Sequence, residues 1–287
     1  MEQEFSRIIQ GCMTWGIWGE NFNTQEMAKR IEENVDLGVT TFDHADIYGD
    51  YTTEEAFDEA FKDSKISRDD IELISKCGIQ LINENRGSYV KHYNYDASYI
   101  ISQAERSLKH LQTDYLDLFL LHRPSPLMQT DEVLEAVSNL KSSGKIKSFG
   151  VSNFTPQQID YLSKEVEVEA NQIQCSLTHY EPMQDDTLFY HQKNNIMTMA
   201  WSPLGGAHKI DELSEFKQAL YEQSNKYKCT ESQVVLAWLL KHPAKIHPVL
   251  GTSKTKRIEE ALGALKVELS LQDWFVLYEA SRGKEVD

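Results

Sequence analysis

The sequence predicts one domain of the α/β class, a (β/α)8 or TIM barrel, and three observations support this expectation. Short β-branched or aromatic runs alternate with longer amphipathic stretches along the whole chain. The short runs are almost continuously apolar, which is typical of strands that a parallel sheet buries on both faces. No Pro-, Gly- or Ser-rich linker interrupts the pattern, so we expect a single domain covering residues 1–287.

Eight short runs are the expected barrel strands. In chain order they span residues 8–13, 39–43, 71–76, 116–122, 146–152, 170–174, 196–201 and 246–250. Eight such units in 287 residues suit one closed barrel. Because barrels of this class carry their active sites at the C-terminal ends of the strands, we expect the site at that face.

The amphipathic stretches between the runs are the expected helices. They span residues 24–37, 53–62, 98–111, 130–143, 156–164 and 212–226. Thr24, Thr53 and Thr130 are the expected N-caps, because a carboxylate follows each of them closely and a first helical turn favours negative charge. Residues 78–96 and 202–213 break the alternation, and long loops on a barrel usually carry function.

The composition excludes several classes of protein. The formal charge of −16 repels nucleic-acid phosphates, so we expect no nucleic-acid partner. No apolar stretch is long enough to cross a bilayer, and the N-terminus lacks the basic and apolar parts of a secretory signal. The four cysteines are widely separated, which fits reduced thiols. We therefore expect a cytoplasmic protein without membrane contact, a monomer or a small homo-oligomer.

Polar residues stand where the apolar runs end. They are Asp43, Lys76, His122, Ser152, Asn153, Gln172 and Trp201. Since the C-terminal ends of barrel strands meet at one face, these residues are expected to converge on one pocket.

Four residues near these ends suit proton transfer to a carbonyl. Asp43 and Lys76 can form a buried ion pair, and the Lys76 ammonium is expected to lower the pKa of a neighbouring phenol below about 10. Tyr48 is the expected phenol, because Gly49 ends its segment and lets the chain fold back over the barrel mouth. His122 can orient or protonate a substrate oxygen.

Reduction of a carbonyl also needs hydride, which no side chain supplies, so the set implies a nicotinamide cofactor. The chain has no GxGxxG motif, which excludes a Rossmann site. Ser152, Asn153 and Gln172 offer donors and acceptors for the carboxamide, and Trp201 offers a flat surface for the ring.

Two further segments suit the phosphates of such a cofactor. In the sequence SPLGG, Ser202, Leu204 and Gly205 belong to a loop whose backbone N–H groups can approach a pyrophosphate. After the eighth run, cations and hydroxyls gather at the expected start of a helix, in the segment that contains Gly251, Thr252, Ser253, Lys254 and Arg257. This basic patch favours the 2′-phosphate of NADP(H) over the bare ribose of NAD.

At these residues the chain resembles the aldo-keto reductases, and especially bacterial members that carry DHADIYG. The resemblance rests on FDHADIYG, ISK, LDLFLLHRPSP, GVSNF, NQI, WSPLGG and GTSKTKRIEEAL, in this order and over nearly the whole chain. It implies that Tyr48 is the general acid, that Asp43 and Lys76 tune it, that His122 positions the carbonyl, and that NADPH provides the hydride.

The resemblance also extends the expected cofactor contacts to Met13, Thr14 and Glu260. Where many relatives have Asn after this glutamate, the chain has Ala261, so an amide contact to adenine is expected to be missing. The substrate is expected to be a small carbonyl compound.

Two other functions compete with this interpretation. Asp43, His44, Asp46 and His122 are residue types that bind divalent metals in barrel hydrolases. Strand alternation turns His44 away from Asp43, and Lys76 brings positive charge to the same place, so we expect no metal site. The second alternative is a non-catalytic NADP(H)-sensing protein on the same barrel, which the complete set of Asp43, Tyr48, Lys76 and His122 argues against.

Overall fold

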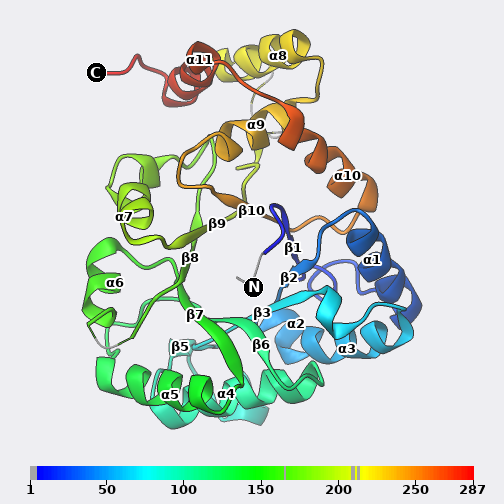
Figure 1. Ribbon diagram of the computed structural model, residues 1–287, viewed down its shortest axis with the longest axis vertical. Helices are drawn as coiled ribbons and strands as arrows, with labels where there is room; N and C mark the ends of the chain where they lie inside the picture. The colour runs from blue at the N-terminus through cyan, green and yellow to red at the C-terminus, as the bar shows by residue number, and fades with distance from the viewer. Residues whose placement is uncertain (1–4, 165, 208–210, 212–213) are drawn as a thin grey trace.

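The computed structural model describes residues 5–164, 166–207, 211 and 214–287, and its main sheet is a closed parallel barrel (Figure 1). Every neighbouring pair of barrel strands is parallel. Around the ring the strands are β1 (Ile9–Gly11), β2 (Thr41–Asp43), β3 (Glu72–Cys77), β6 (Leu116–Leu121), β7 (Ile146–Ser152), β8 (Ala170–Gln174), β9 (Met197–Trp201) and β10 (His247–Leu250), which returns to β1. The predicted (β/α)8 barrel is confirmed, and each strand overlaps one of the predicted runs.

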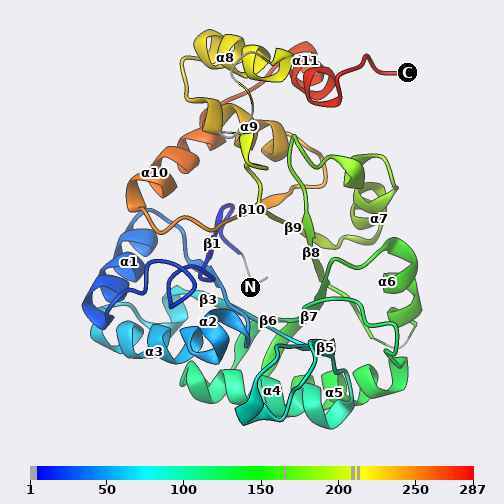
Figure 2. The ribbon, with the colours of Figure 1, turned by 180° about the vertical axis from the view of Figure 1, so that it is seen from behind.

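Helices surround the barrel, one after each strand (Figure 1). They are α1 (Thr24–Asp36), α3 (Thr53–Asp63), α4 (Ala97–His110), α5 (Thr130–Ser142), α6 (Pro156–Leu162), α7 (Thr187–Asn194), α9 (Glu231–Leu240) and α10 (Thr255–Gly263). Two more, α8 (Glu215–Tyr227) and α11 (Leu271–Arg282), lie together outside this ring in both views (Figure 2). Among these described helices, none is long and apolar enough to cross a membrane.

The three predicted N-caps are wrong by one residue. Asn23 caps α1, and its side chain accepts a hydrogen bond from the backbone N–H of Glu26. The residues before α3 and α5 are Thr52 and Gln129, and neither makes a side-chain capping bond. Each predicted threonine is instead the first residue of its helix, and the residue before it occupies the N-cap position.

The segment before α8 lies partly outside the described residues. The helix expected from residue 212 begins at Glu215, and the Ser214 side chain accepts from the backbone N–H of Lys217 at 3.1 Å. Residues 208–210 and 212–213 of the predicted 202–213 loop are outside the described residues.

Apolar side chains fill the inside of the barrel, as they do in this class of fold. The interior cluster includes Ile9, Ile74, Leu118, Leu120, Ala170, Met199 and Val249. Phe5, just before β1, packs against this cluster. The interior of the barrel is therefore a packed apolar core, and polar groups gather at the ends of its strands.

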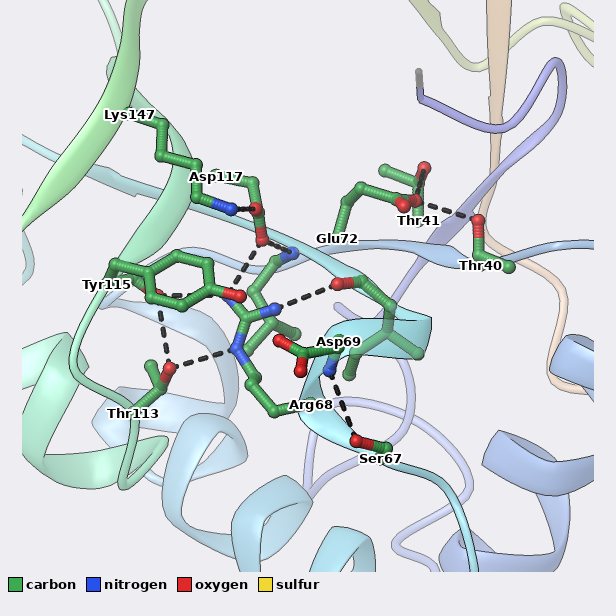
Figure 3. A network of polar contacts seen from close by, with 12 residues as sticks. Thr40, Thr41, Ser67, Arg68, Asp69, Glu72, Thr113, Tyr115, Asp117 and Lys147 are labelled. Atoms are coloured by element: carbon green, nitrogen blue, oxygen red, sulfur yellow. Dashed lines mark hydrogen bonds and ion pairs between the residues drawn. The ribbon is translucent and has the colours of Figure 1, made fainter. Parts of the chain in front are cut away.

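The N-terminal ends of three strands carry a network of polar contacts (Figure 3). Asp117 at the start of β6 accepts hydrogen bonds from Arg68 at 2.7 Å, from Lys147 at 3.0 Å and from the backbone N–H of Leu73 at 2.7 Å. The Tyr115 ring has Arg68 and Lys147 over it, with the cations 4.1 Å and 3.8 Å from its centroid. This network joins β3, β6 and β7 at the end of the barrel away from the expected site.

The predicted loop at residues 78–96 contains a small hairpin. β4 (Ile79–Gln80) pairs antiparallel with β5 (His92–Tyr93). Gly78 has a φ of +114°, and an added Cβ would come within 2.1 Å of the Tyr95 ring, so only glycine fits here. The loop also contacts the short helix α2 (Tyr48–Tyr51), since the backbone N–H of Leu81 donates to the Tyr51 hydroxyl at 3.0 Å.

Candidate active site

Lys76, which is fully buried near the end of β3, contacts two other predicted site residues, Asp43 and Tyr48. Its ammonium donates to Asp43 at 2.8 Å, to the main-chain carbonyl of His44 at 2.6 Å and to the Tyr48 hydroxyl at 3.2 Å. An ammonium has three N–H donors, and all three are used here. Because the Tyr48 oxygen accepts from Lys76, its own proton is left to donate in another direction.

The chain after β2 brings Tyr48 back over the barrel mouth. The backbone N–H groups of His44 and Asp46 continue the pairing with β3, donating to Ile74 at 2.8 Å and to Lys76 at 3.0 Å. The chain then turns sharply, with φ of +59° at Gly49. A Cβ at Gly49 would lie 2.5 Å from the Thr53 hydroxyl, so the turn requires glycine.

The pKa directions show which groups carry protons. Burial alone would lower the pKa of Lys76, but Asp43 and Tyr48 raise it above its ordinary value, so Lys76 is a cation. Burial raises the pKa of Tyr48, and the opposing effect of Lys76 is smaller. The prediction of a phenol with a lowered pKa is therefore wrong, because the phenolate loses more by desolvation than it gains from the ammonium. Tyr48 is a protonated phenol at neutral pH.

His122 faces Tyr48 from the end of β6. The two ring centroids are 6.1 Å apart and the rings are nearly perpendicular. Burial, followed by the charges of Lys76, Arg123 and Lys91, holds the pKa of His122 well below its ordinary value. A neutral imidazole can donate one hydrogen bond and accept another, so His122 can orient a carbonyl oxygen but is not an imidazolium acid.

The predicted carboxamide contacts form a connected chain of hydrogen bonds. Gln172 donates to Asp43 at 3.0 Å, and the Ser152 hydroxyl donates to the Gln172 carbonyl at 2.9 Å. Asn153, which has φ of +61°, donates to the Ser152 hydroxyl at 2.7 Å and accepts from the Trp201 indole at 2.9 Å. The structure thus links the ends of β2, β7, β8 and β9.

A cavity of about 550 Å³ lies between the ends of β9 and β10. The predicted residues that line it are Ser202, Leu204, Gly205, Gly251, Thr252, Arg257 and Glu260. Ser232, Leu236 and Ala261 line it too, and sequence reasoning missed the first two because they lie on α9, away from every strand end. At Gly205 an added Cβ would come within 2.1 Å of the Thr178 side chain, so glycine allows this loop to pack against Thr178.

Besides the carboxamide and ring residues described above, four predicted cofactor contacts lie outside the lining of this cavity. Thr14 donates to the carbonyl of Gly251 at 2.9 Å, and Ser253 donates to Glu20 at 2.8 Å. Met13 is exposed, and Lys254 is the boundary residue of α10 without a side-chain cap. Glu20 is a carboxylate beside the predicted phosphate segment that sequence reasoning did not find.

Comparison with known proteins identifies the chain. The model of the aldo/keto reductase family matches residues 7–281. The chain belongs to the aldo/keto reductase family. An uncharacterised oxidoreductase of Bacillus subtilis, YcsN, is 40% identical over 99% of this chain and 96% of its own length. A 6-dehydroglucose reductase of Agrobacterium fabrum is 39% identical over the same shares of the two chains.

Solved aldo-keto reductases share the architecture. A thermostable enzyme in complex with the inhibitor epalrestat aligns with a TM-score of 0.84 and 26% identity, covering 98% of this chain and 97% of its own. An enzyme from Klebsiella pneumoniae in complex with NADP and acetate aligns with a TM-score of 0.78 and 26% identity, over 97% and 91% of the two chains. This aldo-keto reductase is an NAD(P)H-dependent oxidoreductase.

The residues considered for a metal site have other environments in this aldo-keto reductase. His44 is fully buried, and its ring packs edge-on against Phe57 with centroids 4.5 Å apart. Burial, with the charge of Lys76, lowers the pKa of His44 to about 3. Within the described residues, no three His, Cys, Asp or Glu side chains come together as possible metal ligands.

Proposed function

We propose that this aldo-keto reductase reduces an aldehyde or ketone to an alcohol with NADPH, and that Tyr48 supplies the proton. The observation that carries the proposal is the buried Lys76 ammonium, which donates to Asp43 and Tyr48 at once. NADPH, when bound, supplies the hydride. The neighbouring side chains then need only hold the carbonyl oxygen and give it a proton.

Tyr48 and His122 suit these two tasks. The substrate oxygen would lie between the phenol and the neutral imidazole, whose rings face each other across the barrel mouth. Tyr48 would donate its proton as negative charge develops on that oxygen. The resulting phenolate would stay beside Lys76, which already donates to the Tyr48 oxygen. Lys76 would thus stabilise the phenolate that the reaction leaves behind.

The donor set of the barrel mouth fits a nicotinamide dinucleotide. Ser152, Asn153 and Gln172 present hydroxyl and amide groups beside Asp43, and Trp201 lies next to them, as a carboxamide and its ring require. The glycine-lined cavity between β9 and β10 suits the pyrophosphate and adenosine. Arg257 lines this cavity, and within the described chain it has no carboxylate partner, which supports NADPH over NADH.

The relatives support an aldehyde as substrate. The Agrobacterium fabrum relative is named for its action on 6-dehydroglucose, and a second relative with that name comes from Novosphingobium aromaticivorans. We therefore include a sugar aldehyde among the substrates to be tested. Because all four members of the catalytic set are in contact with each other or face each other, a purely cofactor-sensing role has less support.

Replacement of Tyr48 tests the proposal. Tyr48→Phe removes the proton but little volume, so reduction of a generic activated aldehyde should fall about 10²- to 10⁴-fold while NADPH still binds. Lys76→Met should cause a comparable loss, and the double variant should be little worse than either single variant, because the two residues act as one unit. The assay is NADPH absorbance at neutral pH, with binding followed separately by fluorescence.

Tyr161→Phe, on the exposed surface of α6, is the matched control and should leave turnover unchanged. Because the pKa of Tyr48 is raised, the reduction rate of the wild-type enzyme should stay flat up to about pH 9 and decline only above it. Near wild-type turnover in Tyr48→Phe would refute the assignment. Multiplicative losses in the double variant would show that Lys76 does not act through Tyr48.

A further inference from the structure

Two cations stand beside His122 in a protein whose net charge is −16. Arg123 follows His122 directly, and its guanidinium lies 5.4 Å from the centroid of the Trp201 ring. Lys91 is exposed on the hairpin loop between β4 and β5. Both charges lie close enough to His122 to lower the pKa of its imidazole.

Neither cation is neutralised by a neighbour. Within the described parts of the chain, no carboxylate forms an ion pair with Arg123 or Lys91, although many other Lys and Arg side chains are paired. The nearby carboxylate of Asp43 is already occupied by Lys76 and Gln172. Among the described residues, Arg123 and Lys91 thus have no ion-pair partner, and both can attract an anion to the His122 side of the mouth.

The backbone of Arg123 is held in place. The buried Tyr95 hydroxyl donates to the Arg123 carbonyl at 2.6 Å and accepts from the Arg123 N–H at 3.1 Å. The Trp201 ring lies under the guanidinium. A planar guanidinium carried on this fixed backbone, beside the Trp201 ring, can present a pair of N–H donors to a carboxylate or phosphate.

We propose that the carbonyl substrate of this enzyme carries an anionic group, a carboxylate or a phosphate, which Arg123 binds while His122 and Tyr48 hold the carbonyl oxygen. The proposal rests on the function proposed above. Lys91 adds attraction at longer range, which steers an anion toward the mouth. The shared chemistry of the ligand is a negative charge with two or more oxygen acceptors, placed a few bonds from the carbonyl.

Matched substrates separate the anionic group from the carbonyl. Succinic semialdehyde is compared with butanal, 4-carboxybenzaldehyde with its methyl ester, and glyceraldehyde 3-phosphate with glyceraldehyde. In the wild-type enzyme at low ionic strength, at least one anionic member should have a kcat/KM about ten- to a hundredfold above its neutral partner. Which pair shows the preference distinguishes a carboxylate from a phosphate, and added salt should reduce the preference.

Arg123→Gln should remove most of this preference by raising KM for the anionic member, while reduction of the neutral member persists. Arg123→Lys should keep part of it, since the charge remains but the planar pair of donors is lost. Lys29→Gln removes the same charge from an exposed position on α1 and should leave the preference intact.

The outcomes separate this inference from the proposed function. If the wild-type enzyme reduces neutral and anionic members equally well, or if Arg123→Gln keeps the preference, the anionic substrate is refuted and carbonyl reduction stands. If no member of any pair is reduced although NADPH binds, the proposed function itself fails.

Discussion

Glu20 places a negative charge beside the segment expected to bind the adenosine phosphate. Its carboxylate accepts a hydrogen bond from Ser253 at 2.8 Å, and Glu20 itself is held by a bond from its N–H to the Thr14 carbonyl at 2.8 Å. Arg257, which lines the adjoining cavity, has the opposite charge. The preference between NADPH and NADH should therefore depend on two opposing residues.

Single substitutions measure the two effects. Arg257→Ala should weaken NADPH binding about ten- to a hundredfold and NADH binding much less, because only NADPH carries the 2′-phosphate. Glu20→Gln should strengthen NADPH binding about two- to fivefold, a small effect since the carboxylate is exposed. Dissociation constants for both cofactors, from fluorescence titration, provide the check. Equal changes in the dissociation constants for NADPH and NADH would show that neither residue interacts with the 2′-phosphate.

Sequence reasoning could predict that polar residues at the strand ends come together, but it could not predict this balance of charges. Asp43, Lys76 and His122 could be found because polar residues at the ends of apolar runs are few and the barrel brings them together. The Glu20–Ser253 contact joins residues 233 positions apart, and neither lies at a strand end. The direction in which the pKa of Tyr48 is shifted depends on how deeply the side chain is buried, which the sequence alone does not show.

The loop that contains β4 and β5 acts as a single element attached at both ends. Gly78 begins it beneath the Tyr95 ring, and the Tyr95 hydroxyl closes it against the backbone of Arg123. Between these two points, the backbone N–H of Leu81 donates a hydrogen bond to the hydroxyl of Tyr51, which lies in the turn that carries Tyr48. The loop thus connects the turn that carries Tyr48 with the end of β6 that carries His122.

Removal of one hydroxyl should loosen this element. Tyr95→Phe leaves the N–H and carbonyl of Arg123 without their partner, which should lower the free energy of unfolding by about 1–3 kcal/mol. Since the backbone of Arg123 is then less fixed, KM for the preferred substrate should rise more than kcat falls. Tyr93→Phe, on the exposed strand β5 of the same hairpin, is the control and should change neither quantity. Unfolding in urea and steady-state kinetics provide the measurements, and equal effects of the two variants would contradict this role of Tyr95.

At the scale of elements, the strands were predictable and several helix details were not. Nearly continuous apolar runs mark buried parallel strands, so all the barrel strands were found. β4 and β5 have two residues each, too few to show alternation. Asn23 and Thr24 can both cap a helix, and the extended backbone of Asn23, with ψ of 169°, decides between them. α7 was not predicted because only Thr187, Leu188 and His191 are buried along it.

Across the whole molecule, the two ends of the barrel have different tasks. The C-terminal ends hold Tyr48, Lys76 and His122, whose polar atoms point into the mouth or toward one another. The N-terminal ends hold the network around Asp117 (Figure 3), whose charges are paired with each other. The packed interior of the barrel lies between the two ends. We therefore expect that the contacts stabilising the N-terminal ends can change without moving the side chains at the C-terminal ends.

Substitution of Asp117 tests this separation. Its carboxylate is buried, so Asp117→Ala leaves the Leu73 N–H without an acceptor and two cations without their anion, and it should lower the free energy of unfolding by about 2–3 kcal/mol. Asp117→Asn keeps an oxygen that accepts from Leu73, so its loss should be smaller. Asp69→Ala, which removes an exposed carboxylate from the same region, is the matched control and should change stability by less than about 0.5 kcal/mol.

For all three variants, kcat and KM measured well below the unfolding transition should equal those of the wild-type enzyme. The reason is that the site geometry depends on contacts at the opposite ends of the strands, and none of the three hydrogen bonds of Lys76 involves Asp117. A fall in kcat for Asp117→Ala under conditions where the protein is fully folded would show that strain at the N-terminal ends reaches the barrel mouth. An unchanged unfolding midpoint would show instead that the network in Figure 3 does not stabilise the barrel.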